Sequence, residues 1–172
     1  MNKEKIVAII PSRMASSRLP GKPLLKINNL ELIEHVRRRA LLCKFFYEVY
    51  VATCDREIAS VVNQNNGKVI MTSDKHFDCN ERILEASKKI NAKFIVNVQG
   101  DEILVLPKNL DIICRTIIKD KQSIYWNAVS NLEDKKELIN DTIVKCYISK
   151  NKNILFCSRK EEIIKKIDLN IP

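Results

Sequence analysis

Short apolar runs rich in β-branched residues recur through the first part of the chain. They lie at residues 5–11, 49–53, 68–72 and 94–98. Runs of this length that are almost entirely apolar are typical of strands buried on both faces of a parallel sheet. We therefore expect these four segments to be neighbouring parallel strands.

Segments with helical spacing follow the apolar runs. Residues 31–43 place apolar side chains on one helical face and three consecutive arginines on the other. We expect Asp55 to cap a helix that runs to about residue 65, with Gly67 in the turn that ends it. Asn80 is expected to cap another helix, to about residue 90. Pro107, which a first helical turn tolerates, opens one more, to about residue 119.

The rest of the chain mixes short strands with shorter helical pieces. Strands are expected at residues 124–129, 143–148 and 154–157. Strands that alternate with helices at this spacing favour an α/β fold with a doubly wound, mostly parallel sheet and helices on both faces, a Rossmann-like arrangement. The 172 residues contain no evident linker, so we expect a single domain over 1–172.

The composition is that of a soluble globular protein. Hydrophobic residues make up 45% and charged residues 30% of the chain, which argues against a disordered or membrane class. The apolar runs fall far short of the ~20 residues that span a bilayer, and from the charged residues after Met1 we expect no leader peptide. We expect a cytoplasmic protein with no membrane partner. The six cysteines form no Cys-x-x-Cys pair, so we expect buried thiols and neither a zinc site nor a redox dithiol.

The formal net charge of +9 raises the possibility of nucleic-acid binding. The lysines are spread along the whole chain, however, and no RNA- or DNA-binding motif accompanies them. We therefore expect no nucleic-acid partner and favour a small ligand that carries phosphate.

Two of the three glycines, Gly21 and Gly100, stand among polar residues after predicted strands. Ligands of open α/β sheets bind outside the carboxyl ends of the strands. Around Gly21, one loop carries three fixed positive charges, Arg13, Arg18 and Lys22. Guanidinium forks, an ammonium group and backbone N–H groups suit a triphosphate. The alternative is a solvated basic loop, and neither a Walker A loop nor a Gly-x-Gly-x-x-Gly fingerprint is present.

Around Gly100, an apolar strand ends abruptly in Asn97-Val98-Gln99-Gly100-Asp101-Glu102. The carboxylate of Asp101 can reach a hard cation, and Mg²⁺ is commonly held by one or two carboxylates together with phosphates. The alternative is a solvated turn at a strand end. The nearby basic loop favours the metal site.

These two segments resemble signatures of the 3-deoxy-manno-octulosonate (Kdo) cytidylyltransferase family. The loop at residues 13–24 is similar to Arg-x-x-Ser-Ser/Thr-Arg-Leu-Pro-Gly-Lys-Pro-Leu, and residues 97–102 are similar to Asn-Val-Gln-Gly-Asp-Glu. Weaker similarities follow in order along the chain, including Glu81-Arg82, Val144-Lys145 and Phe156-Cys157-Ser158-Arg159. The resemblance implies a nucleotide-diphospho-sugar transferase-like fold.

The resemblance also implies an activity, the Mg²⁺-dependent transfer of CMP from CTP to the anomeric hydroxyl of Kdo for lipopolysaccharide biosynthesis. Its partners would be CTP and an acidic sugar, and the family forms homodimers. The implied catalytic residues are Arg18, Lys22 and Asp101, with Asp101 as the Mg²⁺ ligand. The implied nucleotide-binding residues are Ser12, Arg13, Arg18, Lys22, Arg82 and Gln99.

The chain departs from the family pattern in two respects. Asp78-Cys79-Asn80 stands where the family has Ser-Gly-Thr. Family members also continue well past the position of Pro172, into a part that supplies a second metal-binding aspartate, most contacts to the sugar and much of the dimer interface. Two alternatives therefore stay open: a cytidylyltransferase for another acidic sugar, such as an amino-Kdo or a nonulosonic acid, and a non-catalytic nucleotide-binding remnant.

Overall fold

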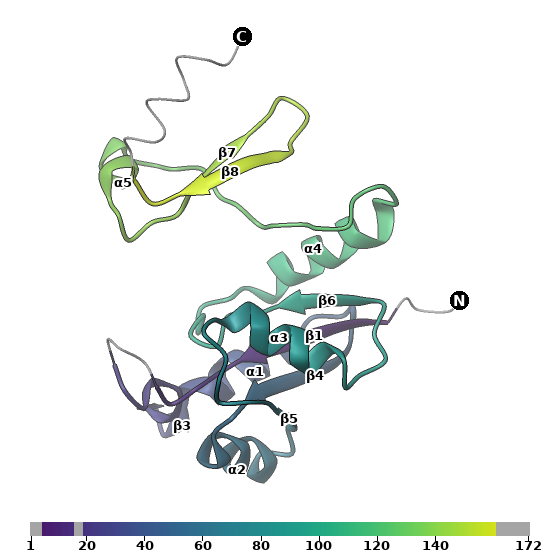
Figure 1. Ribbon diagram of the computed structural model, residues 1–172, viewed down its shortest axis with the longest axis vertical. Coiled ribbons are helices and arrows are strands. Elements are labelled where there is room, and N and C mark those ends of the chain that lie inside the picture. The colour runs from purple at the N-terminus through teal and green to yellow at the C-terminus, as the bar shows by residue number, and fades with distance from the viewer. Residues whose placement is uncertain (1–4, 16–18, 161–172) are drawn as a thin grey trace. The chain divides into compact units, whose positions relative to one another are not determined.

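The computed structural model describes residues 5–15 and 19–160, which fall into two compact units, Met1–Trp126 and Asn127–Pro172 (Figure 1). The expectation of a single domain over 1–172 stays a prediction.

The first unit contains a four-stranded parallel sheet in the order β5-β4-β1-β6. Its strands are β1 (Ile6–Pro11), β4 (Phe46–Thr53), β5 (Lys68–Met71) and β6 (Phe94–Asn97). All residues of β1 are buried, as expected for a central strand covered on both faces. The four parallel strands predicted from the apolar runs are confirmed.

Helices cover both faces of this sheet, which confirms the doubly wound α/β fold (Figure 1). Alternate residues of β1 point to opposite faces, so Ile6, Ala8 and Ile10 join one apolar cluster while Val7 and Ile9 join another. The first cluster includes residues of α1 (Leu32–Leu41), α2 (Arg56–Gln64) and α4 (Pro107–Lys119). The second includes residues of α3 (Cys79–Ser87).

The strand order reverses beside β1. The chain proceeds from β1 to β4 and β5 on one side, then crosses back to place β6 on the other side of β1. Such a reversal opens a crevice at the carboxyl ends of the two strands that flank it. The strand order therefore predicts a ligand site at the carboxyl ends of β1 and β6.

The basic loop continues into a short 3₁₀ helix, η1 (Lys22–Leu24), and a hairpin of β2 (Lys26–Ile27) and β3 (Leu30–Glu31). The sequence did not predict this hairpin. Asn28 and Asn29 have φ angles of 49° and 62° and form its two-residue turn, since asparagine tolerates the left-handed conformation that tight hairpins need.

Two local expectations about helix caps were wrong in detail, and the expected place of Gly67 in the turn after α2 is confirmed. Asp55 occupies the N-cap position of α2, but its side chain makes no capping bond. Asp78, and not Asn80, caps α3, because its carboxylate accepts hydrogen bonds from the backbone N–H groups of Asn80 and Glu81. After α2, Asn66 takes the left-handed conformation, with φ 55°. Gly67 is required there for space, since a Cβ would lie 2.5 Å from Cγ1 of Val62.

The second unit contains α5 (Lys135–Ile139) and an antiparallel hairpin of β7 (Lys145–Ile148) and β8 (Ile154–Ser158). The two predicted strands in this region are confirmed.

The strand predicted at residues 124–129 is wrong, because these residues form no ladder. Trp126 instead packs edge-on against the ring of Phe94, and its indole N–H donates to Asp120.

Candidate functional site

A cavity of about 290 Å³ opens at the carboxyl ends of β1 and β6, at the point where the strand order reverses. It is lined by Pro11, Ser12, Arg13, Ala15, Lys22, Pro23, Leu32, Gln99, Gly100 and Asp101. Five predicted site residues, from two segments far apart in the sequence, therefore share one cavity: Ser12, Arg13, Lys22, Gln99 and Asp101.

Backbone hydrogen bonds hold the basic loop in place beside this cavity. The N–H of Gly21 donates to the carbonyl of Met14 at 3.0 Å, which closes the loop on itself. Gly21 has a φ of 74°, a conformation that side chains disfavour. The N–H of Met14 donates to Oδ2 of Asp55 at 2.8 Å, so a carboxylate at the end of the neighbouring strand β4 anchors the loop.

Lys22 and Asp101 form an ion pair in the cavity, with Nζ 2.7 Å from Oδ2. Both side chains are partly exposed, at 34% and 52%. Solvent screening makes such an exposed pair weak, so a ligand of higher charge can replace it. The pair places the ammonium of Lys22 beside a carboxylate oxygen of Asp101, which is a hard donor for metal ions.

The ends of β1 and β6 approach each other so closely that Gly100 is required. A Cβ at residue 100 would lie 2.5 Å from the carbonyl oxygen of Pro11. The next residue back, Gln99, lines the cavity, and its side-chain amide N–H donates weakly to Sγ of Cys79 at 3.6 Å. The first turn of α3 therefore lies beside the side chain of Gln99, which is predicted to bind nucleotide.

Arg13 links the cavity to the loop at residues 72–78. Its guanidinium donates to the carbonyl of His76 at 3.4 Å. Glu85 on α3 binds this loop twice, accepting from the N–H of Ser73 at 2.8 Å and contacting Nε2 of His76 at 2.6 Å. The ammonium of Lys89, the N–H of Ser73 and the His76 ring together lower the pKa of Glu85 from 4.5 to about 2.

Arg82 was predicted to bind nucleotide, and the structure places it behind the same loop. Its side chain is 2% exposed and donates to the hydroxyl of Thr72 and to the carbonyl of Ser73 at 3.2 Å. Arg82 is not among the residues that line the cavity. Its contact with nucleotide stays a prediction. Its position indicates that Arg82 holds the loop at residues 72–78, which contacts Arg13 at the cavity.

Arg18 lies outside the described residues. Asp55 anchors the basic loop beside the cavity, whereas the sequence predicted only that it caps α2. Because Asp55 follows a predicted strand, the rule that carboxyl ends of parallel strands share one edge was enough to place it near the basic loop.

The donor set suits a hard cation shared with a ligand. Asp101 supplies one carboxylate at the cavity, and Ser12 Oγ is a buried side-chain oxygen without a hydrogen-bond partner among the described residues. Within residues 5–15 and 19–160 there is no cluster of three or more His, Cys, Asp or Glu side chains placed to hold a metal. A metal at Asp101 would therefore take its other ligands from phosphate or water, as Mg²⁺ commonly does.

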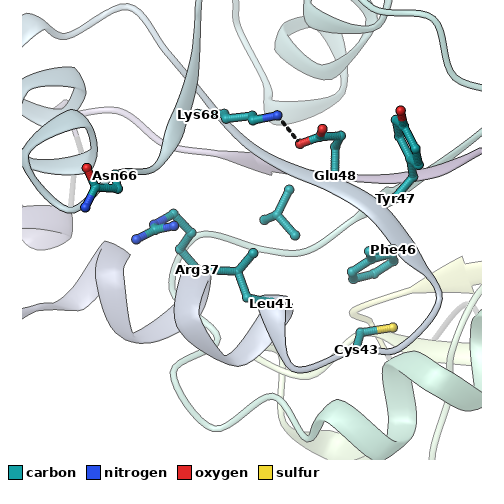
Figure 2. A pocket seen from close by; sticks show the side chains of 9 residues that line it. Arg37, Leu41, Cys43, Phe46, Tyr47, Glu48, Asn66 and Lys68 are labelled. Atoms are coloured by element: carbon teal, nitrogen blue, oxygen red, sulfur yellow. Dashed lines mark ion pairs between the residues drawn. The ribbon is translucent and has the colours of Figure 1, made fainter.

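A second cavity, of about 170 Å³, lies at the opposite edge of the sheet, where β4 and β5 begin (Figure 2). Its arginine, Arg37, is already bound by Glu34 at 2.6 Å and by the carbonyl of Asn65 at 2.9 Å. Lys68 at its rim pairs with Glu48 at 2.5 Å. Arg37 and Glu34 are 7% and 0% exposed, so their ion pair is less readily exchanged for ligand charge than the partly exposed pair of Lys22 and Asp101. This second cavity therefore suits an anionic ligand less well than the one at Lys22.

Within the described part of the chain, no helix has the length and apolar character needed to cross a membrane.

Comparison with known proteins gives consistent matches. A family model described as Cytidylyltransferase matches residues 7–170. A 3-deoxy-manno-octulosonate cytidylyltransferase of Thermodesulfovibrio yellowstonii is 34% identical over 95% of this chain and 69% of its own length. A 3-deoxy-manno-octulosonate cytidylyltransferase 2 of Actinobacillus pleuropneumoniae is 40% identical over 90% of this chain and 62% of its own length.

A solved structure gives the same match in three dimensions. The structure of CMP:2-keto-3-deoxy-manno-octonic acid synthetase complexed with CTP superposes with a TM-score of 0.82 at 32% identity. The match covers 92% of this chain and 65% of that protein. The chain thus spans roughly two thirds of the length of the proteins that it matches.

Proposed function

Since this chain belongs to the cytidylyltransferase family, we propose that it binds CTP and transfers its CMP group to the anomeric hydroxyl of Kdo, with release of pyrophosphate. The observation that carries the proposal is the single cavity that holds Ser12, Arg13, Lys22, Gln99 and Asp101. The relatives named for this activity and the match to a CTP complex support the same substrates.

The residues of the cavity suit a reaction that depends on positioning and charge neutralisation. In-line attack on the α-phosphorus spreads negative charge over the phosphate oxygens and the leaving pyrophosphate. Lys22 would leave Asp101 and bind these oxygens, and Arg13 would supply a second cation from the same loop. Arg18 is proposed to act with them. Gln99, at the end of β6, would orient the nucleotide or the incoming sugar through its amide.

Backbone groups around Ser12 are proposed to contact the pyrimidine. The N–H of Ser12 already donates to the carbonyl of Ala52 at 2.9 Å, which fixes the end of β1 against β4. This bond keeps the start of the basic loop in one position, so the backbone groups at Ser12 lie at the cavity before a ligand binds. Preorganisation of this kind lowers the cost of binding.

Asp101 is proposed to hold Mg²⁺. When bound, the cation would neutralise phosphate charge and align the triphosphate. Asp101 is suited to this role because it lies beside Lys22, so a cation and a triphosphate can replace the existing ion pair without leaving an unpaired charge.

The test is pyrophosphate release by the purified 172-residue chain with CTP, Kdo and Mg²⁺. ATP, GTP and UTP in place of CTP are the nucleotide controls, and omission of Kdo is the acceptor control. Release that requires both CTP and Kdo is the expected result. Isothermal titration with CTP runs in parallel, since it measures binding without turnover.

Binding of CTP without release would contradict catalysis by this chain and leave a nucleotide-binding protein. Release with CTP and a different acidic sugar, but not with Kdo, would contradict the proposed acceptor. If the chain neither binds CTP nor releases pyrophosphate, the assignment of the cavity itself is overturned.

A further inference from the structure

Two cysteines of the second unit lie directly opposite each other on the β7–β8 hairpin. Cys146 on β7 is the register partner of Cys157 on β8, and their Sγ atoms are 3.2 Å apart. The sequence predicted no redox dithiol, because the two residues are not neighbours along the chain. Pairing of the strands brings them together.

We propose that Cys146 and Cys157 form a thiol–disulfide exchange site, at which a small-molecule disulfide converts the pair into a cross-strand disulfide. This inference is independent of the proposed function, because it concerns only the hairpin and its two thiols.

The register of the hairpin suits a disulfide at these two positions. Residues directly opposite in an antiparallel pair have Cα atoms about 4.5–5.5 Å apart. A disulfide requires a Cα separation of about 4.4–6.8 Å. The register of β7 and β8 therefore satisfies this requirement at residues 146 and 157.

Neighbouring contacts hold that register. The rings of Tyr147 and Phe156, the next cross-strand pair, are stacked with centroids 4.8 Å apart. Lys145 is 4% exposed, and its ammonium donates to the carbonyls of Asn140 and Arg159. Because a stacked pair lies on one side of the cysteines and a buried lysine on the other, the two thiols stay opposite each other.

The two thiols differ in solvent exposure, and this difference predicts the order in which they react with a small disulfide. Cys157 is exposed and Cys146 is half-buried. Contact with Cys157 and partial burial raise the pKa of the Cys146 thiol above its usual value. Because a small disulfide reaches the exposed sulfur of Cys157 more easily, Cys157 reacts first and Cys146 second.

The exchange balances with glutathione disulfide as the oxidant. The Cys157 thiolate attacks one sulfur of the small disulfide, whose S–S bond breaks and releases one glutathione thiolate. The Cys146 thiolate then attacks Sγ of Cys157, breaking the mixed disulfide and releasing the second glutathione thiolate. The two protons lost by the cysteines pass to these leaving groups, so two protein thiols and one glutathione disulfide give one protein disulfide and two glutathione thiols.

The test equilibrates the full chain, under native conditions without oxygen, in a series of reduced and oxidised glutathione mixtures. Free thiols are then alkylated in denaturant and the protein is digested with trypsin. Cleavage after lysine and arginine leaves Cys146 in peptide 146–150 and Cys157 in peptide 153–159. The expected product is these two peptides joined by a disulfide, together with loss of two alkylatable thiols.

The chain offers a matched control in Cys43 and Cys114, which are neighbours in the first unit and are 5% and 0% exposed. We expect this buried pair to remain alkylatable at every glutathione ratio that oxidises the hairpin. The Cys146→Ser variant is expected to stop at the mixed disulfide on Cys157, and the Cys43→Ser variant to behave like the native chain.

Accumulation of the mixed disulfide on Cys157 in the native chain, to the same extent as in Cys146→Ser, would overturn the proposal. So would a disulfide from either cysteine to Cys54, or oxidation of Cys43 and Cys114 at the same ratio as the hairpin. The joined peptides of the native chain decide the question even if a serine variant fails to fold.

Discussion

The ammonium of Lys22 lies 2.7 Å from the carboxylate of Asp101, although 79 residues separate them in the sequence. This contact joins the two segments that resemble the family signatures. Since both side chains are partly exposed, the pair is screened by solvent and contributes little to folding. We propose that ligand charges replace this pair in the cavity.

Replacing Asp101 by asparagine is expected to abolish Mg²⁺-dependent pyrophosphate release while leaving the melting temperature nearly unchanged. The amide cannot neutralise a cation, and loss of an exposed ion pair costs at most about 1 kcal/mol. The matched control is Glu102→Gln, which removes the next carboxylate along the chain, one that is exposed and does not line the cavity. Turnover by Asp101→Asn equal to that of the native chain would sink the metal assignment.

Replacing Gly100 by alanine is expected to weaken CTP binding as well as stability. The new Cβ would lie 2.5 Å from the carbonyl oxygen of Pro11, so the ends of β1 and β6 must separate. Overpacking of this kind costs about 1–3 kcal/mol. Gly67→Ala is the control, since its Cβ meets Val62 at 2.5 Å, away from the residues that line the cavity.

Both glycine variants are expected to unfold at lower urea concentration than the native chain. Isothermal titration of the folded fraction should then separate them, with weaker CTP binding in Gly100→Ala only. Equal loss of affinity in both variants would mean that the effect comes from general destabilisation and not from the strand ends.

Replacing Asp55 by alanine is expected to raise the KM for CTP. The carboxylate accepts the Met14 N–H at 2.8 Å and so positions the basic loop. Hydrogen bonds to charged groups contribute about 1.5–3 kcal/mol, of which part would appear as weaker binding. Asp55→Asn keeps an acceptor oxygen and should recover most of the affinity. If asparagine and alanine gave the same KM, Asp55 would not act through this bond.

The free energy of unfolding is expected to decrease as the pH is lowered, because Glu85 becomes protonated. The Lys89 ammonium, the Ser73 N–H and His76 lower its pKa from 4.5 to about 2 in the folded chain. Between these two values the unfolded chain binds more protons than the folded one, so the stabilisation present above about pH 4.5 is lost progressively toward about pH 2.

Urea unfolding of the native chain and of Glu85→Gln as a function of pH measures this effect. The variant should be less stable at neutral pH, and the difference between the two should shrink as the pH falls below 4.5. Glu102→Gln serves again as the control for removal of an exposed carboxylate. A difference that stays constant from neutral pH to pH 2 would show that Glu85 does not titrate as described.

Much of the fold could be predicted because the relevant signals are local. The run that forms β1 is apolar at nearly every position, so it had to be buried on both faces, and Pro107 opened its helix where a first turn accepts proline. The basic loop and the Asp101 segment could be assigned to one edge, since each follows a parallel strand. At residues 124–129 apolar character alone wrongly predicted a strand, because Trp126 packs against Phe94 from an irregular segment.

The sequence by itself therefore determined the parallel strands, the helices between them and the residue types at their carboxyl ends. Only the tertiary structure decided which of these side chains meet: Lys22 with Asp101, Asp55 with Met14, and Cys146 with Cys157. It also placed Arg82 behind the loop and not in the cavity. The physical reason is that these contacts depend on strand order and register, and many strand orders satisfy the same local pattern, while only one brings these residues together.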